Sequence, residues 1–325
     1  MQQQNVVICG AGIAGISAAY HLAVVHGLRD ILVIDERPPL SLTSDKSTEC
    51  YRNWWPGPGD TMVAFMNRSI DLLEQLAARH GNPFHLNRRG YLYLTGDKDS
   101  IPGMISSAEQ TSQLGAGSLR IHRGKSAGDP YQPSQPQAFS SGLDGADLLL
   151  DPGKLLHHYP FLTDRVAAGL HVRRAGWFSA QQLGGLLLEE AKKHGVHLLQ
   201  DRVASVEITH HRVSAVLLES GERVPARNFV NAAGPFLKPV SALLDIDLPV
   251  YNEPHGKIAF EDSEGIINRE SPLMIWNDPI HLPWSDADKA ELATHEDTSW
   301  LLDAFPPGLH FRPEGGPGSQ TILAL

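Results

Sequence analysis

The sequence predicts an α/β fold that begins with a Rossmann-like βαβ unit, and three observations indicate it. The short, β-branched run Val6–Ile8 is typical of a buried strand. It leads directly into a G-x-G-x-x-G turn over residues 10–15, which a helical pattern follows. A second apolar strand, Ile31–Ile34, ends at Asp35. This order predicts a turn that binds a dinucleotide; the alternative is an ordinary βαβ unit that happens to contain a glycine turn.

Each glycine of the turn has a physical role in such a site. Gly10 makes the tight bend, Gly12 lets the backbone approach a pyrophosphate, and Gly15 lets the helix pack closely on the strand. Ile13 and Ala14 begin the helix, so their N–H groups and the positive end of the helix dipole face the phosphates. We therefore predict that this turn contacts the cofactor's phosphates.

Two acidic residues follow the second strand. Asp35 lies about 20 residues beyond Gly15, where an acceptor for the ribose hydroxyl of a dinucleotide is expected. Glu36 comes directly after it. Both carboxylates are therefore predicted to lie at the ribose end of the site.

Composition excludes several classes of protein. The chain has 325 residues, 42% of them hydrophobic and 20% charged, which predicts a globular protein long enough for two domains. Its net charge of −10 argues against binding to nucleic acid or to an anionic membrane surface. Two cysteines cannot form a disulfide scaffold and suit a reducing compartment. Without a signal-like start or a long apolar run, the expectation is a soluble, cytoplasmic protein.

Beyond Asp35 the chain alternates between regular elements and long loops. Residues 40–60 form an aperiodic loop rich in Ser, Thr, Pro and Gly, and loops of this length are often functional. An apolar stripe that includes Met62, Phe65 and Ile70 predicts a helix over residues 61–80 with that stripe in the core. The remaining predicted elements are a strand at 90–94, a loose segment at 127–145, a helix at 180–193, strands at 196–199, 203–208, 213–218 and 223–224, and a strand at 229–235.

Three of these blocks together resemble the FAD-dependent oxidoreductases of the D-amino-acid oxidase, glycine oxidase and sarcosine oxidase superfamily. They are residues 7–35 with the glycine turn, the loop 44–55, which is similar to the family's flavin-contacting loop, and residues 229–236, which end in an N-A-A-G turn. The resemblance covers the chain from its start to about residue 260. It implies a Rossmann-like FAD-binding domain of the glutathione-reductase-like type, together with a discontinuous, mainly antiparallel β substrate domain.

The resemblance also implies domain limits. Residues 1–82 and 152–238 would form the FAD-binding domain, and residues 83–151 and 239–325 the substrate domain. The family has a further C-terminal segment with a glycine-rich turn and a helix, and nothing in this sequence matches it. The expectation is therefore a truncated chain that is less soluble and binds flavin more weakly than a version extended by that segment.

Further site residues follow from the resemblance. Arg52 occupies the place where sarcosine oxidase-like members hold the substrate carboxylate, a task that suits the guanidinium fork; the alternative is a surface arginine on a loop. His255 is either a substrate-pocket residue or a turn residue. Five further residues would lie near the FAD, namely Lys46, Ser47, Val203, Ala233 and Gly234. The loop 44–55 lacks a histidine, so non-covalent FAD is expected, and the His pairs at 157–158 and 210–211 lack metal-ligand spacing, so no metal is expected.

The resemblance implies an enzyme that oxidises the C–N bond of a small secondary or N-methylated amino acid, with oxygen or an electron carrier as the partner that reoxidises the flavin. The alternative is a non-catalytic flavin-binding protein or a fold remnant that acts in assembly. An NAD dehydrogenase would share the glycine turn, but it would explain neither the loop with Arg52 nor the N-A-A-G turn at 231–234.

Overall fold

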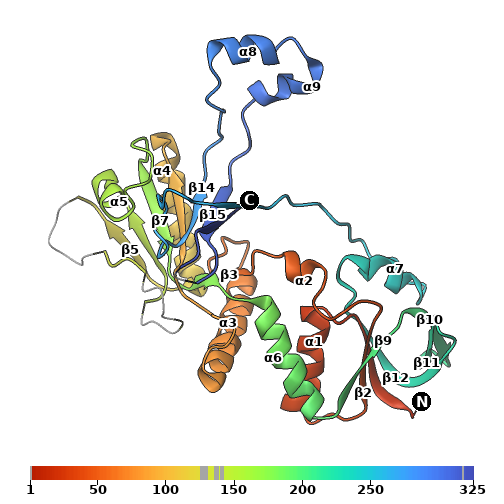
Figure 1. Cartoon of the computed structure of the whole chain (residues 1–325). Coiled ribbons are helices and arrows are strands. Elements are labelled where there is room, and N and C mark those ends of the chain that lie inside the picture. Colours follow the sequence, from red (N-terminus) through yellow and green to blue (C-terminus); the bar gives the residue numbers. More distant parts are fainter. Residues whose placement is uncertain (1, 125–130, 135–138, 140–142, 317) are drawn as a thin grey trace. The chain divides into compact units, whose positions relative to one another are not determined.

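Strand β1 (Gln4–Cys9) lies in the middle of a six-stranded sheet with the order β10-β11-β12-β1-β2-β9 (Figure 1). The structure is a computed structural model, and it describes residues 2–124, 131–134, 139, 143–316 and 318–325. Within it the chain forms two compact units: residues 1–49, 83–85 and 178–254 make unit 1, and residues 50–82, 86–177 and 255–325 make unit 2.

Unit 1 contains the sheet and the predicted dinucleotide turn. Its other strands are β2 (Ile31–Asp35), β9 (Val196–Gln200), β10 (Val203–Thr209), β11 (Arg212–Leu218) and β12 (Arg223–Asn231). Its helices are α1 (Ile13–Tyr20), continued by a π-helical turn at His21–Val25, α2 (Thr43–Lys46), α6 (Ala180–Lys193), a short 3₁₀ turn at Gly234–Phe236, and α7 (Leu237–Ala242).

At β1 and β2 both faces of this sheet are buried, which explains why these two strands read as continuous apolar runs rather than alternating ones. On β1, Val6 and Ile8 belong to the hydrophobic cluster that α1 and α6 cover. Val7 and Cys9 belong to the cluster on the opposite face, beneath the meander of β10 and β11. Figure 1 shows α1 and α6 side by side against the sheet. The glycine turn after β1 is thus fixed between two packed layers.

Strand β12 corrects the sequence-based prediction of two separate strands at 223–224 and 229–235. It is one continuous strand over Arg223–Asn231. Its first part pairs antiparallel with β11, and its remainder pairs parallel with β1. A single strand therefore joins the meander to the parallel layer, and its end at Asn231 lies next to the end of β1 at Cys9.

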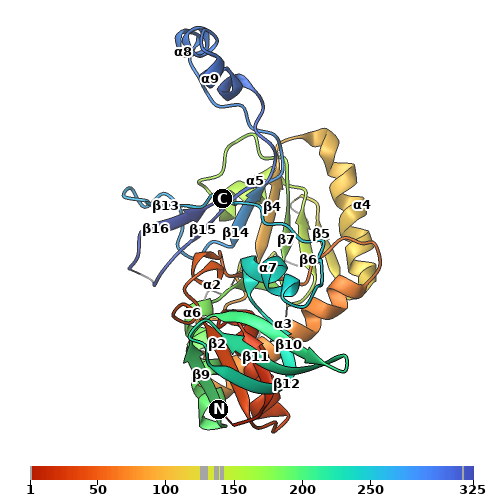
Figure 2. The same cartoon turned by 90° about the vertical axis from the view of Figure 1, so that its right-hand side faces the viewer.

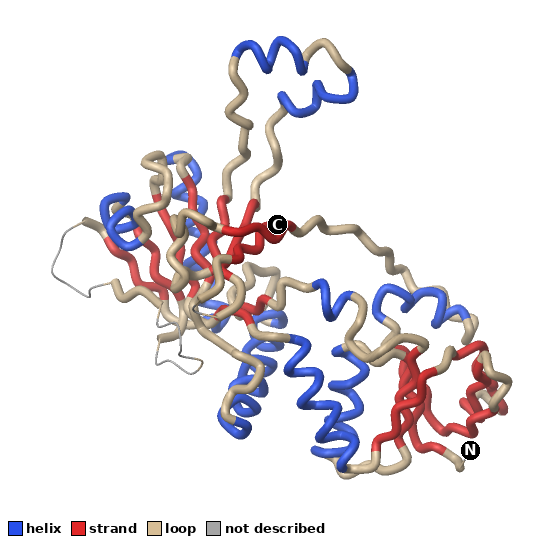
Figure 3. Tube along the Cα trace, in the orientation of Figure 1, coloured by secondary structure: helices blue, strands red, loops and turns tan. Residues whose placement is uncertain are grey.

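Unit 2 is built on an eight-stranded sheet with the order β13-β16-β15-β14-β4-β7-β6-β5 (Figures 2 and 3). Its strands are β4 (Tyr91–Thr95), β5 (Leu119–His122), β6 (Ala146–Leu149), β7 (Ala168–Val172), β13 (Ile258–Glu261), β14 (Leu273–Trp276), β15 (Leu309–Pro313) and β16 (Thr321–Ala324). Among the described strands of this sheet, β14 pairs parallel with β4 and β6 with β5, and the other neighbouring strands pair antiparallel. The prediction of a mainly antiparallel second sheet is confirmed.

Helices and a two-stranded ribbon complete unit 2. The helices are α3 (Thr61–His80), α4 (Ile101–Thr111), α5 (Pro152–His158), α8 (Asp286–Leu292) and α9 (Glu296–Ser299). The ribbon pairs β3 (Cys50–Arg52) antiparallel with β8 (Ala175–Trp177). The loop predicted at 40–60 therefore contains a short helix, α2, and a strand, β3. The strand forms because residues 175–177, far away in sequence, supply its partner.

Helix α3 has the predicted limits, and Gly81 ends it in the left-handed conformation. The predicted core stripe is wrong in part. Val63 and Ile70 are buried, but Met62 and Phe65 are exposed. The buried face is turned toward Val63 because the hydrophobic cluster of this unit receives that residue together with the ribbon residue Trp177. The loose segment predicted at 127–145 lies largely outside the described residues.

A buried charge cluster holds one end of the eight-stranded sheet together. Asp147 on β6 accepts two hydrogen bonds from Arg120, at 2.7 and 2.9 Å, and one contact from His122 at 2.8 Å. Arg173 donates to its second oxygen. Burial alone would raise the pKa of Asp147, but the hydrogen bonds and charges of Arg120, Arg173 and His122 overcome this effect and hold the pKa below its ordinary value.

Asp147→Asn should therefore destabilise unit 2 strongly. The amide cannot neutralise the guanidinium groups, and breaking a buried pair in this way costs about 3–5 kcal/mol. The loss should appear as a lower midpoint in urea unfolding followed by tryptophan fluorescence. Glu207→Gln, which breaks an exposed pair with Arg223, is the matched control and should leave the midpoint unchanged. Equal midpoints for wild type and Asp147→Asn would contradict this account.

Candidate functional site

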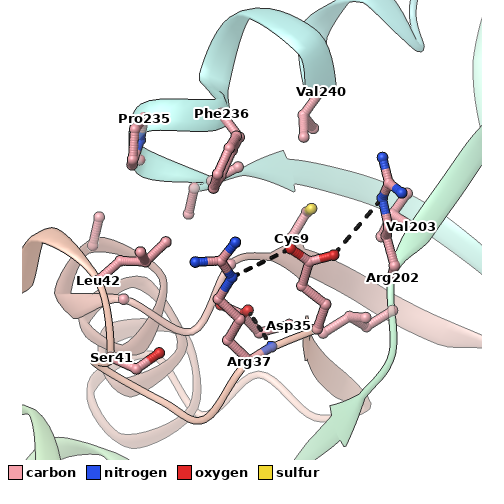
Figure 4. A pocket seen from close by; sticks show the side chains of 18 of the residues that line it. Cys9, Asp35, Arg37, Ser41, Leu42, Arg202, Val203, Pro235, Phe236 and Val240 are labelled. Atoms are coloured by element: carbon pink, nitrogen blue, oxygen red, sulfur yellow. Dashed lines mark hydrogen bonds and ion pairs between the residues drawn. The ribbon is translucent and has the colours of Figure 1, made fainter. Parts of the chain in front are cut away.

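A cavity of about 600 Å³ opens in unit 1 at the carboxyl ends of the parallel strands (Figure 4). This is the place where open α/β sheets bind their ligands. The ends of β1 and β2, the N-terminus of α1, the loop 36–44, the start of β10 and the segment 232–243 form its wall. Nine of the residues predicted to bind the cofactor line it: Gly10, Gly12, Ile13, Ala14, Asp35, Glu36, Val203, Ala233 and Gly234.

The N-terminus of α1 faces this cavity. Gly12 is the N-cap residue in an extended conformation and has no side chain to cap the helix. The first N–H groups of a helix lack acceptors within the helix. One of them, that of Ile13, donates to Oγ of the buried Ser44 at 3.0 Å. The free N–H groups and the positive end of the helix dipole would stabilise the negative charge of a ligand phosphate.

The three glycines of the turn differ in how close an added Cβ atom would lie to neighbouring atoms. A Cβ on Gly10 would lie 2.3 Å from the carbonyl oxygen of Ala232, and the φ of Gly10 is +113°, which favours glycine. A Cβ on Gly15 would lie 1.9 Å from the carbonyl oxygen of Gly10. A Cβ on Gly12 would meet only Oγ of Ser44, at 3.4 Å. Gly10 and Gly15 are thus required by backbone packing, whereas Gly12 leaves space toward the cavity.

The two predicted acids have different surroundings. Asp35 accepts hydrogen bonds from the N–H of Ala11 at 2.7 Å and from the N–H of Arg37 at 2.9 Å, so it fixes the turn and the following loop. Glu36 forms ion pairs with Arg37, at 3.4 Å, and with Arg202, at 3.8 Å. These pairs are exposed and weak. A ribose hydroxyl can therefore reach carboxylate oxygens at this end of the cavity.

Cys9 lies on the floor of the cavity at the end of β1. Burial, together with the charges of Asp35 and Glu36, raises the pKa of its thiol to about 12. The thiol is therefore neutral at physiological pH and is a poor nucleophile. Cys9 acts here as a small apolar residue of the cavity wall.

Several cavity residues were not predicted from the sequence. Ser44 caps α1 from a distant loop, Arg202 pairs with Glu36, and Arg37 lies over the ring of Phe236 at 5.7 Å from its centroid. The signal for Phe236 was present, because it lies two residues beyond the predicted N-A-A-G turn and ends the block 229–236. Ser44 begins the loop 44–55 that resembles a flavin-contacting loop, but its cap on α1 and the role of Arg202 carried no local signal, since both depend on contacts with residues far away in the sequence.

Three predicted cofactor residues do not line the cavity. Gly15 lies behind the turn against Gly10, as described above. Lys46 is exposed at the end of α2 and pairs with Asp45. Ser47 follows α2, where its Oγ accepts the N–H of Glu49 at 2.9 Å. Their roles in cofactor binding stay predictions.

Arg52 and His255, the two predicted substrate residues, belong to unit 2. Arg52 ends β3, and its guanidinium stacks over the ring of Trp55 at 3.8 Å from the centroid; the ring of Tyr91 is 5.8 Å away. The Nε atom of Arg52 is buried and has no hydrogen-bond partner among the described residues. His255 is exposed on the segment before β13.

Within the described ranges, no group of three or more His, Cys, Asp or Glu side chains is placed to hold a metal ion.

The cavity in unit 1 fits an FAD molecule on three grounds. The N-terminus of α1, where the N-cap Gly12 supplies no side-chain cap, and the open space at Gly12 suit a pyrophosphate. The carboxylates of Asp35 and Glu36 lie at its wall, where a ribose needs acceptors. Its volume is within the usual range for cofactor and ligand sites.

In the described part of the chain, no helix is long and apolar enough to cross a membrane.

Known proteins share this architecture. The mitochondrial dimethylglycine dehydrogenase of Rattus norvegicus is 23% identical over 313 residues, which cover 93% of this chain and 33% of that protein. The chain thus spans about a third of the length of this curated relative.

Two solved structures show the same fold. The L-proline dehydrogenase of P. horikoshii has a TM-score of 0.70 at 18% identity, with coverage of 99% of this chain and 69% of that chain. The glycine oxidase of Bacillus cereus has a TM-score of 0.69 at 13% identity, with coverage of 99% and 70%. Residues 5–283 match the model of the DAO family, described as FAD dependent oxidoreductase. This chain therefore belongs to the DAO family of FAD-dependent oxidoreductases.

Proposed function

We propose that this chain binds FAD in the cavity of unit 1 and oxidises the C–N bond of a small secondary or N-methylated amino acid. The FAD-binding domain would comprise residues 1–82 and 152–238, with Arg52 facing the substrate, and the substrate domain residues 83–151 and 239–325, although part of the segment 239–243 also lines the FAD cavity. The family match supports the redox chemistry. When bound, FAD accepts a hydride from the carbon next to the amine nitrogen, and the protein supplies binding and orientation.

The proposed substrate class rests on the surroundings of the Arg52 guanidinium. Its guanidinium is held over Trp55, its Nε is buried, and no carboxylate lies within ion-pair distance of it among the described residues. Removing even part of a cation from water without a counter-ion is costly, and a substrate carboxylate would offset that cost. The contact with the Trp55 ring also restricts the position of the guanidinium fork, and such a fork suits bidentate binding of a carboxylate.

The names of the similar proteins agree with a small amino acid. Dimethylglycine, L-proline and glycine, from which those proteins take their names, all carry a carboxylate on the carbon that bears the amine. Dimethylglycine and proline are also substituted on nitrogen. Arg52 would hold that carboxylate and leave the C–H bonds next to nitrogen for the redox step. His255 stays a second candidate for the substrate pocket.

Cofactor attachment is part of the same proposal. The loop 44–55 offers no histidine for a covalent bond to the flavin, and Cys9 is a neutral thiol on the cavity wall. FAD would therefore be held non-covalently. Oxygen or an electron carrier would take up the electrons after each turnover.

Anaerobic reduction of the flavin tests this proposal. The chain loaded with FAD should lose its visible absorbance when N-methylglycine is added, and it should respond far less to dimethylamine, which lacks the carboxylate. Denaturation with acid should release the flavin into solution. A chain that binds FAD but is not reduced by any of a panel of N-methylated and cyclic amino acids would instead be a non-catalytic flavin-binding protein.

A further inference from the structure

Trp55 makes two separate contacts with Arg52, which precedes it by three residues. Its indole N–H donates to the backbone carbonyl of Arg52 at 3.1 Å. Its ring lies against the guanidinium of the same residue, with Cζ of Arg52 3.8 Å from the ring centroid. One side chain therefore contacts Arg52 both at its backbone and at its charged end.

The two residues between them are buried and anchor this corner of the chain. Asn53 is 1% exposed, and its backbone N–H donates to the carbonyl of Arg174 at 3.1 Å. Trp54 is 4% exposed and belongs to the main hydrophobic cluster of unit 2, against which Trp55 also packs. Because the intervening backbone is held in this way, the fold itself places the indole of Trp55 against Arg52.

The contact with Trp55 restricts the charged end of Arg52. The Nε atom of Arg52 is buried and has no hydrogen-bond partner among the described residues. The ring of Tyr91 is more distant, at 5.8 Å from Cζ. A cation within about 6 Å of an aromatic ring is attracted to its face, and the attraction is strongest for tryptophan. Trp55 is therefore the closer and the stronger of these two aromatic neighbours.

We propose that Trp55 is a positioning residue that sets how strongly the site prefers substrates with a carboxylate, an inference that rests on the proposed role of Arg52. A long side chain that becomes immobile on binding loses rotamer freedom, which weakens the affinity. Because Trp55 already restricts Arg52 in the folded protein, less freedom remains to be lost. The guanidinium fork then meets the carboxylate in a preformed orientation.

Variants without an aromatic ring test this role. In the FAD-loaded chain, Trp55→Leu should weaken the binding of N-methylglycine roughly 5- to 30-fold, measured from the concentration dependence of anaerobic flavin reduction. The response to dimethylamine should not change, because this amine has no carboxylate. Trp55→Phe should recover most of the loss, since it keeps a ring beside the guanidinium although it cannot donate to the carbonyl of Arg52.

A binding measurement separates this effect from turnover. Methoxyacetate is an ether that carries the same carboxylate as N-methylglycine and has no amine to oxidise. Its affinity for the FAD-loaded chain, measured by calorimetry, should fall in Trp55→Leu by the same factor. In an Arg52→Ala background, Trp55→Leu should have no further effect, because the charge that it positions is gone.

Trp300→Leu is the matched control. The indole N–H of Trp300 also donates to the carbonyl three residues earlier, that of Asp297, at 2.8 Å. No guanidinium lies over its ring in the part of the chain that the structure describes. This variant should bind methoxyacetate as wild type does. Trp55→Met, which also lacks a ring, takes the place of Trp55→Leu if the latter does not fold.

The outcomes distinguish this inference from the proposed function. If Arg52→Ala lowers the affinity for methoxyacetate and the ring-free variants of Trp55 do not, Trp55 has no positioning role and the proposed function stands. A loss that is equal for N-methylglycine and dimethylamine would also overturn the inference, because it would indicate a general defect of the loop. If Arg52→Ala binds methoxyacetate as wild type does, the proposed carboxylate site fails, and the role of Trp55 fails with it.

Discussion

Arg52→Ala should lower kcat/KM for an amino-acid substrate by roughly 30- to 1,000-fold, which corresponds to about 2–4 kcal/mol of transition-state binding. The reason is geometric as well as electrostatic. The guanidinium is held by Trp55 at 3.8 Å, and its buried Nε has no acceptor in the described part of the chain. Alanine would leave the substrate carboxylate in the site without a cation.

The decisive measurement compares substrates with and without a carboxylate. Wild type should prefer N-methylglycine strongly over dimethylamine, and Arg52→Ala should lose most of that preference. Arg52→Lys should recover only part of it, because an ammonium group lacks the planar fork and stacks less well on Trp55. Arg79→Ala, on the exposed side of α3, is the matched control and should behave as wild type. If Arg52→Ala discriminates as well as wild type, Arg52 does not bind the carboxylate.

Gly12→Val should weaken FAD binding by roughly 10- to 150-fold, the equivalent of losing one charge-assisted hydrogen bond. The added side chain would occupy the space beside the N-terminus of α1 where the pyrophosphate must lie. Because a Cβ at this position meets only Oγ of Ser44, at 3.4 Å, the fold of unit 1 should tolerate the change. Equilibrium titration with FAD, together with thermal unfolding of the apoprotein, measures both effects.

The neighbouring glycines provide the contrast. Gly15→Val should lower the melting temperature of the apoprotein sharply, because its Cβ would lie 1.9 Å from the carbonyl oxygen of Gly10. Gly185→Val on α6 is the matched control, since a Cβ there meets nothing within 4 Å. It should change neither stability nor FAD affinity. Unchanged FAD affinity in a folded Gly12→Val variant would show that the glycine turn does not bind the cofactor.

Local sequence signals determined the elements that depend on neighbours along the chain. The limits of α3 and α6 follow from their apolar periodicity and from the residues that end them, and both agree with the structure. The strand–turn–helix around Gly10 is likewise encoded within about 20 residues by its glycine spacing, although the close contact that requires Gly10 is with the distant Ala232, and Gly12 is not required by packing. The same local signals led to the family, and with it to FAD.

Long-range pairing decided the rest. The sequence showed a loop at 40–60, but β3 forms there because β8, more than a hundred residues later, pairs with it. Met62 and Phe65 fit a helical stripe, yet tertiary packing buries Val63 instead. Ser44 and Arg202 reach the cavity through contacts that no local period encodes. The periodicity of apolar residues indicates that one face of a helix or strand will be buried. Which segment covers that face depends on contacts between parts of the chain that are distant in sequence, and these contacts exist only in the folded chain.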